Sequence, residues 1–329
     1  LKNNVLNYIL SVVSNIITIM KNYTISVPER LTGKKISELF ELSTDFLRVI
    51  NQYDRVTFDI SKCNFINPAG TVLLSAFRDI YKDKSPEIET YVRYKKSSRV
   101  TKILQSWGLY TLEELYHDSY VKSISNYTVP LERCNNTDEC LDVHEKIMDH
   151  IKVRTECTDN TFATLDYILN EIWDNAGTHG YECYYTEEYP KPIYFQSFSY
   201  KSGVEIAILD LGQGIANSLK SKDFYRNFST DQILKKALEE KVTGHPNNSP
   251  GYGLYSSSEL IKSNSGELHI WSSGRSINVT NNSTRTGIGG FENGTLVYLK
   301  IKAQIDTKFE EIMNGRKVEN YLEDHQITL

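Results

Sequence analysis

The sequence predicts an α/β (α+β) protein built from two folded domains. The chain has 329 residues, which is more than one compact core of ordinary size holds. Strand-like and helix-like segments alternate from residue 22 to about residue 114, and a second alternating set begins near residue 127. Hydrophobic residues make up 40% of the chain and charged residues 24%, a composition typical of globular domains.

These patterns place one domain at residues 22–125 and the other at residues 126–305, with a C-terminal tail at 306–329. The join is the polar stretch from residue 117 to residue 126. Residues 1–21 form an N-terminal helix whose apolar stripe has to be buried against its own domain or against a second copy. Polar residues interrupt this segment, so we expect neither a membrane span nor a signal peptide.

The overall charge and the cysteines limit the function classes. A formal net charge of −5 gives no general attraction to nucleic acid or to an acidic membrane surface, so any bound anion needs a local site. The five cysteines are scattered and form no C-x-x-C pair, which indicates neither a disulfide framework nor a zinc site. A cytoplasmic location is therefore expected.

The first domain contains a strand at residues 55–60, in which Val56, Phe58 and Ile60 alternate inward. Asn67 and Pro68 then supply a capping residue and a first-turn proline for a helix. A strand at residues 89–94 and a helix at 98–107 complete the unit. The apolar face of the helix that follows Pro68 consists of Val72, Leu73, Ala76, Phe77 and Ile80.

The second domain is predicted in the order helix, strand, loop, helix, strand, strand. Apolar residues recur at helical spacing between residues 161 and 177, and a strand follows at 204–210. A long polar stretch then runs to Pro250. The closing elements are a helix at 252–262 and strands at 266–271 and 295–301.

The first candidate motif lies on the helix at residues 161–177. Glu171, Asn175 and either Thr178 or His179 share one face of that helix. An amide oxygen is a suitable ligand for Mg²⁺, and a carboxylate one turn away can orient or deprotonate a nucleophile. Alone, this pair is also compatible with an ordinary solvated helix face.

Two glycine motifs follow. Asp210, Gly212 and Gly214 lie at the end of a strand, where the glycines allow a sharp turn and close backbone approach to a ligand, and where the acid can accept the exocyclic amine of adenine. Gly251, Gly253 and Leu254 open a helix, whose free N–H groups favour a phosphate. Each could be an ordinary turn. Their occurrence in this order together with the acid–amide helix favours one shared site.

Together the three motifs resemble the N, G1 and G2 boxes of the GHKL ATPases, and Thr295 resembles the threonine on that family's last strand. The string from Glu171 through Asn175 and His179 to Gly180 and Tyr181 is similar to the anti-sigma-factor serine-kinase branch. The resemblance implies a two-layer α/β (Bergerat) sandwich that binds ATP and Mg²⁺. It also implies roles for single residues: Glu171 as general base, Asn175 as Mg²⁺ ligand, Asp210 on the adenine, and Gly212, Gly214, Gly251 and Gly253 around the nucleotide.

That family places a mobile lid between its two glycine motifs. In this chain the stretch contains several cations, any one of which could contact the terminal phosphate: Lys220, Lys222, Arg226, Lys235, Lys236, Lys241 and His245.

The segment from Val56 to Leu74 resembles the STAS domains of anti-sigma antagonists, which are the substrates of those serine kinases. Where that family has its phosphorylated serine, this chain has Asn67 and Pro68, and the nearest substitute hydroxyl is that of Thr71. The N-terminal domain is therefore expected to act as a docked scaffold or pseudo-substrate.

Two functions remain open at this point. One is an enzyme, an ATP-dependent serine/threonine protein kinase or ATPase regulated by the fused STAS-like domain. The other is a non-catalytic, nucleotide-gated protein-interaction module. Both require a protein partner, and the dimers common in the family make a homodimer an expected assembly; a nucleic-acid or membrane partner is not expected.

Overall fold

The computed structural model describes residues 20–95, 98, 100–101, 104, 128–179, 191–244 and 251–315. The predicted N-terminal helix, the join at residues 117–126, and most of the helix at 98–107 and of the C-terminal tail lie outside these residues. Within the described ranges, no helix is long and apolar enough to span a membrane.

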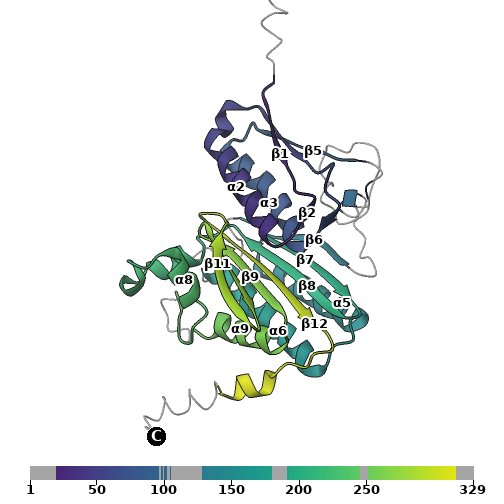
Figure 1. Ribbon diagram of the computed structural model, residues 1–329, viewed down its shortest axis with the longest axis vertical. Coiled ribbons are helices and arrows are strands. Elements are labelled where there is room, and N and C mark those ends of the chain that lie inside the picture. Colours follow the sequence, from purple (N-terminus) through teal and green to yellow (C-terminus); the bar gives the residue numbers. More distant parts are fainter. Residues whose placement is uncertain are drawn as a thin grey trace, which may run out of the picture.

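The N-terminal unit is a three-stranded parallel sheet covered by two helices (Figure 1). The predicted strands at 55–60 and 89–94 are confirmed as β3 and β5, while β1 and α2 were not predicted individually. The strand order is β1-β3-β5. The elements are β1 (Asn22–Ser26), β2 (Arg30–Leu31), α2 (Lys34–Val49), the 3₁₀ turn η1 (Ile50–Gln52), β3 (Arg55–Asp59), β4 (Phe65–Ile66), α3 (Pro68–Lys84) and β5 (Glu89–Arg93).

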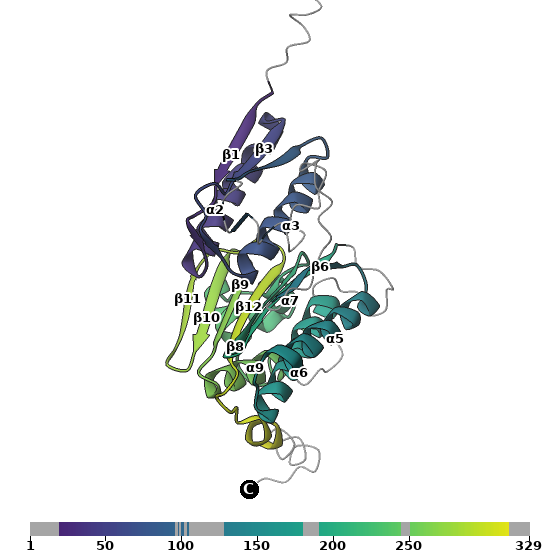
Figure 2. The ribbon, with the colours of Figure 1, turned by 90° about the vertical axis from the view of Figure 1, so that its right-hand side faces the viewer.

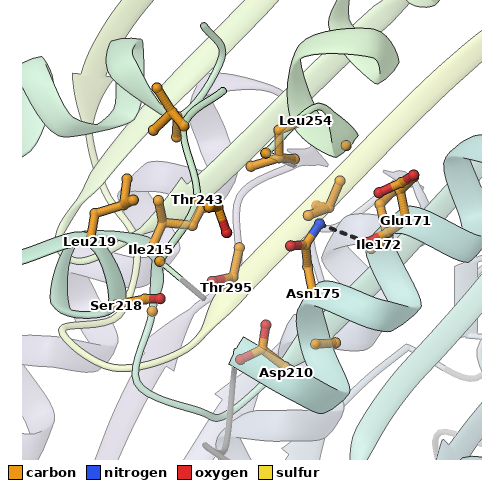
Figure 3. Close-up of a pocket in the computed structure, with 18 of the residues that line it drawn as sticks. Glu171, Ile172, Asn175, Asp210, Ile215, Ser218, Leu219, Thr243, Leu254 and Thr295 are labelled. Carbon is orange, nitrogen blue, oxygen red and sulfur yellow. Dashed lines mark hydrogen bonds between the residues drawn. The ribbon is translucent and has the colours of Figure 1, made fainter. Parts of the chain in front are cut away.

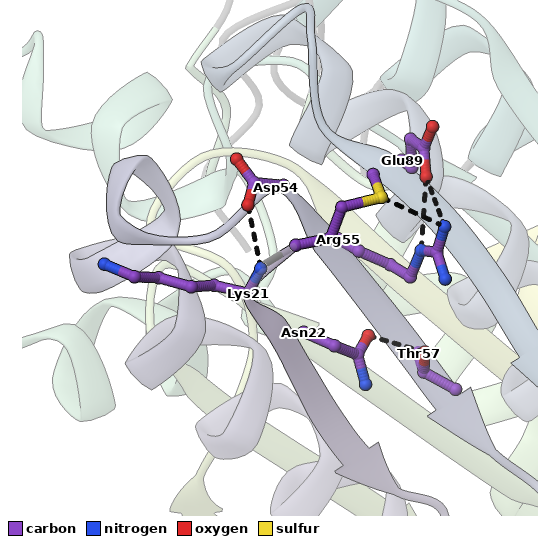
Figure 4. A network of polar contacts seen from close by, with 7 residues as sticks. Lys21, Asn22, Asp54, Arg55, Thr57 and Glu89 are labelled. Carbon is purple, nitrogen blue, oxygen red and sulfur yellow. Dashed lines mark hydrogen bonds and ion pairs between the residues drawn. The ribbon is translucent and has the colours of Figure 1, made fainter. Parts of the chain in front are cut away.

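Polar side chains link the three parallel strands at the end where they begin (Figure 4). Arg55 on β3 donates to the carboxylate of Glu89 on β5 at 2.8 Å, and the Thr57 hydroxyl donates to Asn22 on β1 at 2.8 Å. These contacts agree with the register that places Asn22 and Glu89 opposite Arg55.

The helix predicted after Pro68 is confirmed as α3. Asn67 caps it, since its side chain accepts a hydrogen bond from the Gly70 N–H at 3.1 Å. The predicted apolar face is buried apart from the half-buried Ile80, but α3 also buries residues outside that face: Ala69, Gly70, Thr71, Leu74 and Tyr81. The helix therefore packs on more than one side.

The second unit is built on a seven-stranded sheet in the order β11-β10-β9-β12-β8-β7-β6, in which every neighbouring pair is antiparallel. This is richer than the predicted order of helix, strand, loop, helix, strand, strand. The strands are β6 (Thr128–Cys134), β7 (Ile193–Tyr200), β8 (Gly203–Asp210), β9 (Glu267–Ser272), β10 (Arg275–Thr280), β11 (Ser283–Ile288) and β12 (Thr295–Lys302).

Helices α5 (Thr137–Arg154), α6 (Asp159–Asp174) and α9 (Gly253–Ser263) cover one face of this sheet. The opposite face is covered by the N-terminal unit, with α3 against β7, β8 and β12 (Figures 1 and 2). The predicted two-layer sandwich thus gains a third layer. One hydrophobic core joins the two units, because alternate residues of the strands, such as Leu209 and Leu296, belong to the same cluster as Phe40 and Phe77.

The stretch predicted as a long polar loop is partly helical. It contains α7 (Ile215–Lys220), a 3₁₀ turn η3 (Asp223–Tyr225) and α8 (Thr230–Lys236). A small core of its own, formed by Ala216, Leu219, Ile233 and Ala237, holds these elements together. Ser229 and Gln232 form a reciprocal capping box at the start of α8, a sequence signature of a helix start that would have indicated it.

Candidate functional site

The motif residues meet in one open-sided cavity between the sheet and helices α6, α7 and α9 (Figure 3). Its empty volume, including the part open to solvent, is about 910 Å³. The residues that line it are Glu171, Ile172, Asn175, Ala176, Ile208, Asp210, Gly214, Ile215, Ser218, Leu219, Ala237, Val242, Thr243, Gly244, Gly251, Gly253, Leu254, Thr295 and Val297.

Glu171 and Asn175 reach the cavity from the C-terminal end of α6, where the helix continues as a π-helical turn, Asn175–His179. The Asn175 amide nitrogen donates to the Glu171 carbonyl at 2.6 Å, so its side-chain oxygen points toward the middle of the cavity (Figure 3). This orientation leaves an oxygen ligand free for a cation. Widened turns of this kind occur frequently at functional sites.

Asp210 closes the floor of the cavity at the end of β8. It accepts a hydrogen bond from the Gly212 N–H at 2.9 Å, and its other oxygen is directed into the cavity (Figure 3). Burial raises the pKa of Asp210 to about 7, although the Gly212 and Thr295 hydrogen bonds act in the opposite direction. The site thus contains a buried acceptor that gains from a ligand N–H donor.

Two serines at the end of β9 hold the loop that follows Asp210. The hydroxyl of Ser272 accepts from the Ile215 N–H at 2.9 Å, and that of Ser273 accepts from the Ala216 N–H at 3.1 Å. Gly214 has a φ of 79°, and a Cβ there would lie 2.9 Å from the Ser273 hydroxyl oxygen. Glycine is therefore needed both for the backbone turn and for the close approach.

The N-terminus of α9 lies on the opposite side of the cavity from this loop. Its first residues, Gly253 and Leu254, line the cavity, and the N-cap residue Tyr252 makes no side-chain capping hydrogen bond. The preceding Gly251 adopts a φ of 72°. A Cβ on Gly253 would collide with the Glu171 carboxylate, so this glycine lets the acid approach the helix start. The N–H groups at a helix start favour an anion such as a phosphate.

The cavity wall that closes the site beyond Gly214 comes from the α7–α8 segment and is mostly apolar: Ile215, Leu219, Ala237 and Val242. With Ile208 and Val297 on the sheet, it forms an apolar surface suited to a flat ring. Ser218 and Thr243 add hydroxyls. Among the described lining residues there is no Lys or Arg, so Lys220, Lys222, Arg226, Lys235, Lys236 and Lys241 do not line the cavity, while His245 is outside the described residues.

Most of the predicted site residues are brought together. Those that line the cavity are Glu171, Asn175, Asp210, Gly214, Gly251, Gly253, Leu254 and Thr295. Gly212 does not line it and instead donates its N–H to Asp210. His179 ends the π-helical turn, and its side chain lies outside the described part of the chain.

The apolar wall and the two β9 serines were not predicted. Ile208 and Val297 could have been found from strand alternation, because they lie two residues from Asp210 and Thr295 on the same face. The contacts of Ser272 and Ser273 depend on a strand more than fifty residues farther along the chain, as the 57-residue separation of Ile215 and Ser272 illustrates. No local sequence pattern marks them.

The donor set bears on which ions fit. Within the described ranges, no group of three or more His, Cys, Asp or Glu residues could hold a metal alone. A cation at Asn175 would therefore need most of its ligands from water and from a bound anion, which is the usual manner of Mg²⁺ with phosphates.

Comparison with known proteins adds no identification. No protein-family model matches the sequence, and no curated protein matches it.

Proposed function

We propose that the chain is an ATP- and Mg²⁺-binding protein of the GHKL type, with a STAS-like unit fused to it. The observation that carries the proposal is one cavity lined by residues from all three motifs, which are as far apart in sequence as Glu171 and Leu254. The buried acceptor, the apolar wall and the open helix start correspond to the amine, the ring and the phosphates of ATP.

In this proposal each residue has a defined part. Asp210, with Thr295 beside it, accepts the exocyclic amine of the adenine, and Ile208 and Val297 contact the ring. The N–H groups at the start of α9 bind the phosphates, and the Asn175 side-chain oxygen ligates Mg²⁺, which would supply neutralisation of phosphate charge. Glu171, beside Gly253, acts as the base toward an attacking hydroxyl or water.

Calorimetric titration of ATP with Mg²⁺ into the chain tests the binding step. Wild type is expected to bind, Asp210→Asn to bind at least about tenfold more weakly, and Asn175→Ala to lose the Mg²⁺ dependence of binding. The matched control is Asn217→Ala, an exposed amide near the cavity rim that does not line it. A wild-type chain that binds no nucleotide at millimolar concentration would contradict the proposal.

Whether the site performs catalysis is a separate question. Release of phosphate by wild type and its loss in Glu171→Gln, with nucleotide binding retained, would support a kinase or ATPase. Binding without turnover in either protein would support the nucleotide-gated interaction module.

One observation favours a non-substrate role for the N-terminal unit. Thr71 is fully buried, its hydroxyl bonds to the Asn67 carbonyl at 3.3 Å, and Asn67 is itself buried. Because its hydroxyl is buried and hydrogen-bonded, Thr71 is not accessible to accept a phosphate in the folded chain. In our proposal the unit is a permanent scaffold.

A further inference from the structure

The end of β9 contacts the N-terminal unit with one residue and the cavity loop with the next. Trp271 is 1% exposed, lies in the core shared with the N-terminal unit, and donates from its indole N–H to the Ser37 hydroxyl on α2 at 3.0 Å. Ser272 points to the opposite face, because successive side chains of a strand alternate. It is fully buried and holds the Ile215 N–H.

Ser272 is the centre of a hydroxyl network at the cavity floor. It donates to the Gly294 carbonyl at 3.0 Å and lies 3.1 Å from the Thr295 hydroxyl, which in turn contacts Asp210. One side chain thereby sets both the loop that starts α7 and the start of β12. These are the two segments that flank Asp210 in the cavity.

A second segment repeats the arrangement. Phe291, between β11 and β12, packs edge-on against Phe40 at 4.6 Å and Phe77 at 5.6 Å between ring centroids, so the N-terminal helices hold it. Its carbonyl accepts from the Gly274 N–H at 2.8 Å, directly after the two serines. Gly289 approaches α2 so closely that a Cβ would lie 2.7 Å from the Cβ of Ser37.

We propose that Ser272 is a positioning residue for the nucleotide site and that the Trp271–Ser272 step couples the docked N-terminal unit to it. The unit's contacts with Trp271 and Phe291 fix the end of β9, and the hydrogen bond from the Ile215 N–H to Ser272 makes the position of the loop at Gly214–Ala216 depend on it. This inference rests on the nucleotide-binding function proposed above. It assigns the N-terminal unit an active part in setting nucleotide affinity rather than a passive attachment.

The physical basis is the close packing of the two layers. A displacement of the Trp271 ring moves the β9 backbone as a whole, since packed interiors transmit strain rather than absorb it. The Ser272 hydroxyl moves with the backbone, and its hydrogen bonds to Ile215 and Gly294 fix the cavity floor. Coupling between two sites then follows in both directions: nucleotide must also change the surroundings of Trp271.

Equilibrium binding of ATP with Mg²⁺, followed by tryptophan fluorescence, tests the coupling. The chain has three tryptophans, and the emission of Trp271 is obtained as the difference between the wild type and Trp271→Phe. We expect nucleotide to change that part in wild type. Ser272→Ala should bind about tenfold more weakly and should lose the Trp271 response at saturating nucleotide, because the hydrogen bonds that connect the two are gone.

Ser37→Ala is the complementary variant, since it removes the hydrogen-bond partner of Trp271 without replacing Trp271 or any residue that lines the cavity. We expect an altered Trp271 emission and nucleotide binding about threefold weaker, from the loss of one neutral hydrogen bond. The matched control is Ser199→Ala, a fully buried serine of the same sheet whose hydroxyl makes no hydrogen bond within the described structure. Circular dichroism melts check that each variant is folded before titration.

The outcomes separate the two proposals. A wild type that binds while Ser272→Ala keeps both its affinity and its Trp271 response overturns the coupling alone. Loss of affinity in Ser272→Ala with an intact Trp271 response, and no effect of Ser37→Ala, also overturns it, since Ser272 would then act only locally. A wild type that binds no nucleotide overturns the proposed function and the coupling with it.

Discussion

Burial in the folded chain disfavours the ionised form of the Asp210 carboxyl group relative to water. It is 6% exposed, and burial raises its pKa from 3.8 to about 7. The ionised form only accepts hydrogen bonds and accepts them most strongly, whereas burial favours the protonated form, which also carries an O–H donor. Ligand binding and folding therefore prefer opposite protonation states of one group.

This conflict predicts that nucleotide affinity depends on pH. If, as proposed, the adenine amine donates to the ionised carboxylate, the apparent affinity should fall about tenfold between pH 8 and pH 6, with its midpoint near the pKa of about 7. Titration with adenosine avoids the ionisation of the phosphates. In Asp210→Asn the affinity should be low and independent of pH over the same range. An equal pH dependence in both proteins would mean that it arises from a group other than Asp210.

The same conflict predicts that Asp210→Asn stabilises the fold at high pH. The pKa of an unperturbed aspartate is 3.8 and that of Asp210 in the folded chain is about 7, so the stability of the wild type is fully present below about pH 4 and is reduced as pH rises through 7. The variant should gain up to about 4 kcal/mol at pH 8. The gain should vanish near pH 4. Urea unfolding at both pH values measures it, and a gain independent of pH would contradict the assignment.

Helix α3 carries the contact between the two units, and its start is set by Asn67. Helix α3 packs against the seven-stranded sheet, and its Phe77 and Tyr81 stack on Phe58 of β3 in its own sheet. The Asn67 side chain caps the helix and also hydrogen-bonds Tyr298 of β12. Asn67 thus has a structural task at the junction between the two units.

We predict that Asn67→Ala destabilises the chain by about 1–2 kcal/mol, from the lost cap and the unpaired Gly70 N–H. The exposed Asn64, three residues earlier and outside the helix, is the matched control, and Asn64→Ala should stay within about 0.5 kcal/mol. Denaturant midpoints at constant slope decide between them. Equal effects of the two variants would mean that the Asn67 capping hydrogen bond does not stabilise the chain.

Single elements were predictable where a local signal exists. The cap and proline at Asn67 and Pro68 located α3, and the alternation in residues 55–60 located β3. Helix α2 and the α7–α8 segment were missed, although the apolar residues of α2 are buried in the shared core and those of α7–α8 form a small core of their own. The pattern of α3 indicated one apolar face, because the burial of Leu74 and Thr71 becomes apparent only when a second sheet is present.

For the cavity, the residues at motif positions were predictable and the long-range ones were not. Asp210 and Gly214 are marked by a strand end with glycines, and Asn175 by its spacing from Glu171. Ser272, Val242 and Thr243 reach the site through tertiary folding, and no spacing rule connects them to it. Gly212 lies in the motif yet supports Asp210 instead of lining the cavity.

The two units share one core, so the molecule is expected to unfold as one. Phe291 of the second unit is 8% exposed and contacts two phenylalanines of the first. Ion pairs at the edge add to this: Arg133 to Asp79 at 3.0 Å and Lys191 to Asp83 at 2.8 Å. These exposed or half-exposed pairs contribute little beside the aromatic contact.

Phe291→Ala should therefore lower the free energy of unfolding by about 3–5 kcal/mol. The whole chain should still unfold in one transition, with far- and near-ultraviolet circular dichroism changing together. Phe224, 72% exposed on the α7–α8 segment, is the control, and its alanine variant should change stability by less than about 1 kcal/mol. Two separate transitions in the wild type would mean that the units fold independently.

The cavity and the docked unit lie on opposite faces of one sheet: Ile208 and Val297 face the cavity, and Leu209 and Leu296 face the first unit. Fusion therefore gives the first unit no raised effective concentration at the mouth of the cavity, because no linker length matters when a sheet stands between donor and acceptor. If the proposed nucleotide binds there, a group transferred from it would not reach the described residues of the first unit. Transfer to another protein molecule would follow second-order kinetics in the two proteins, as it would for two chains that were never joined.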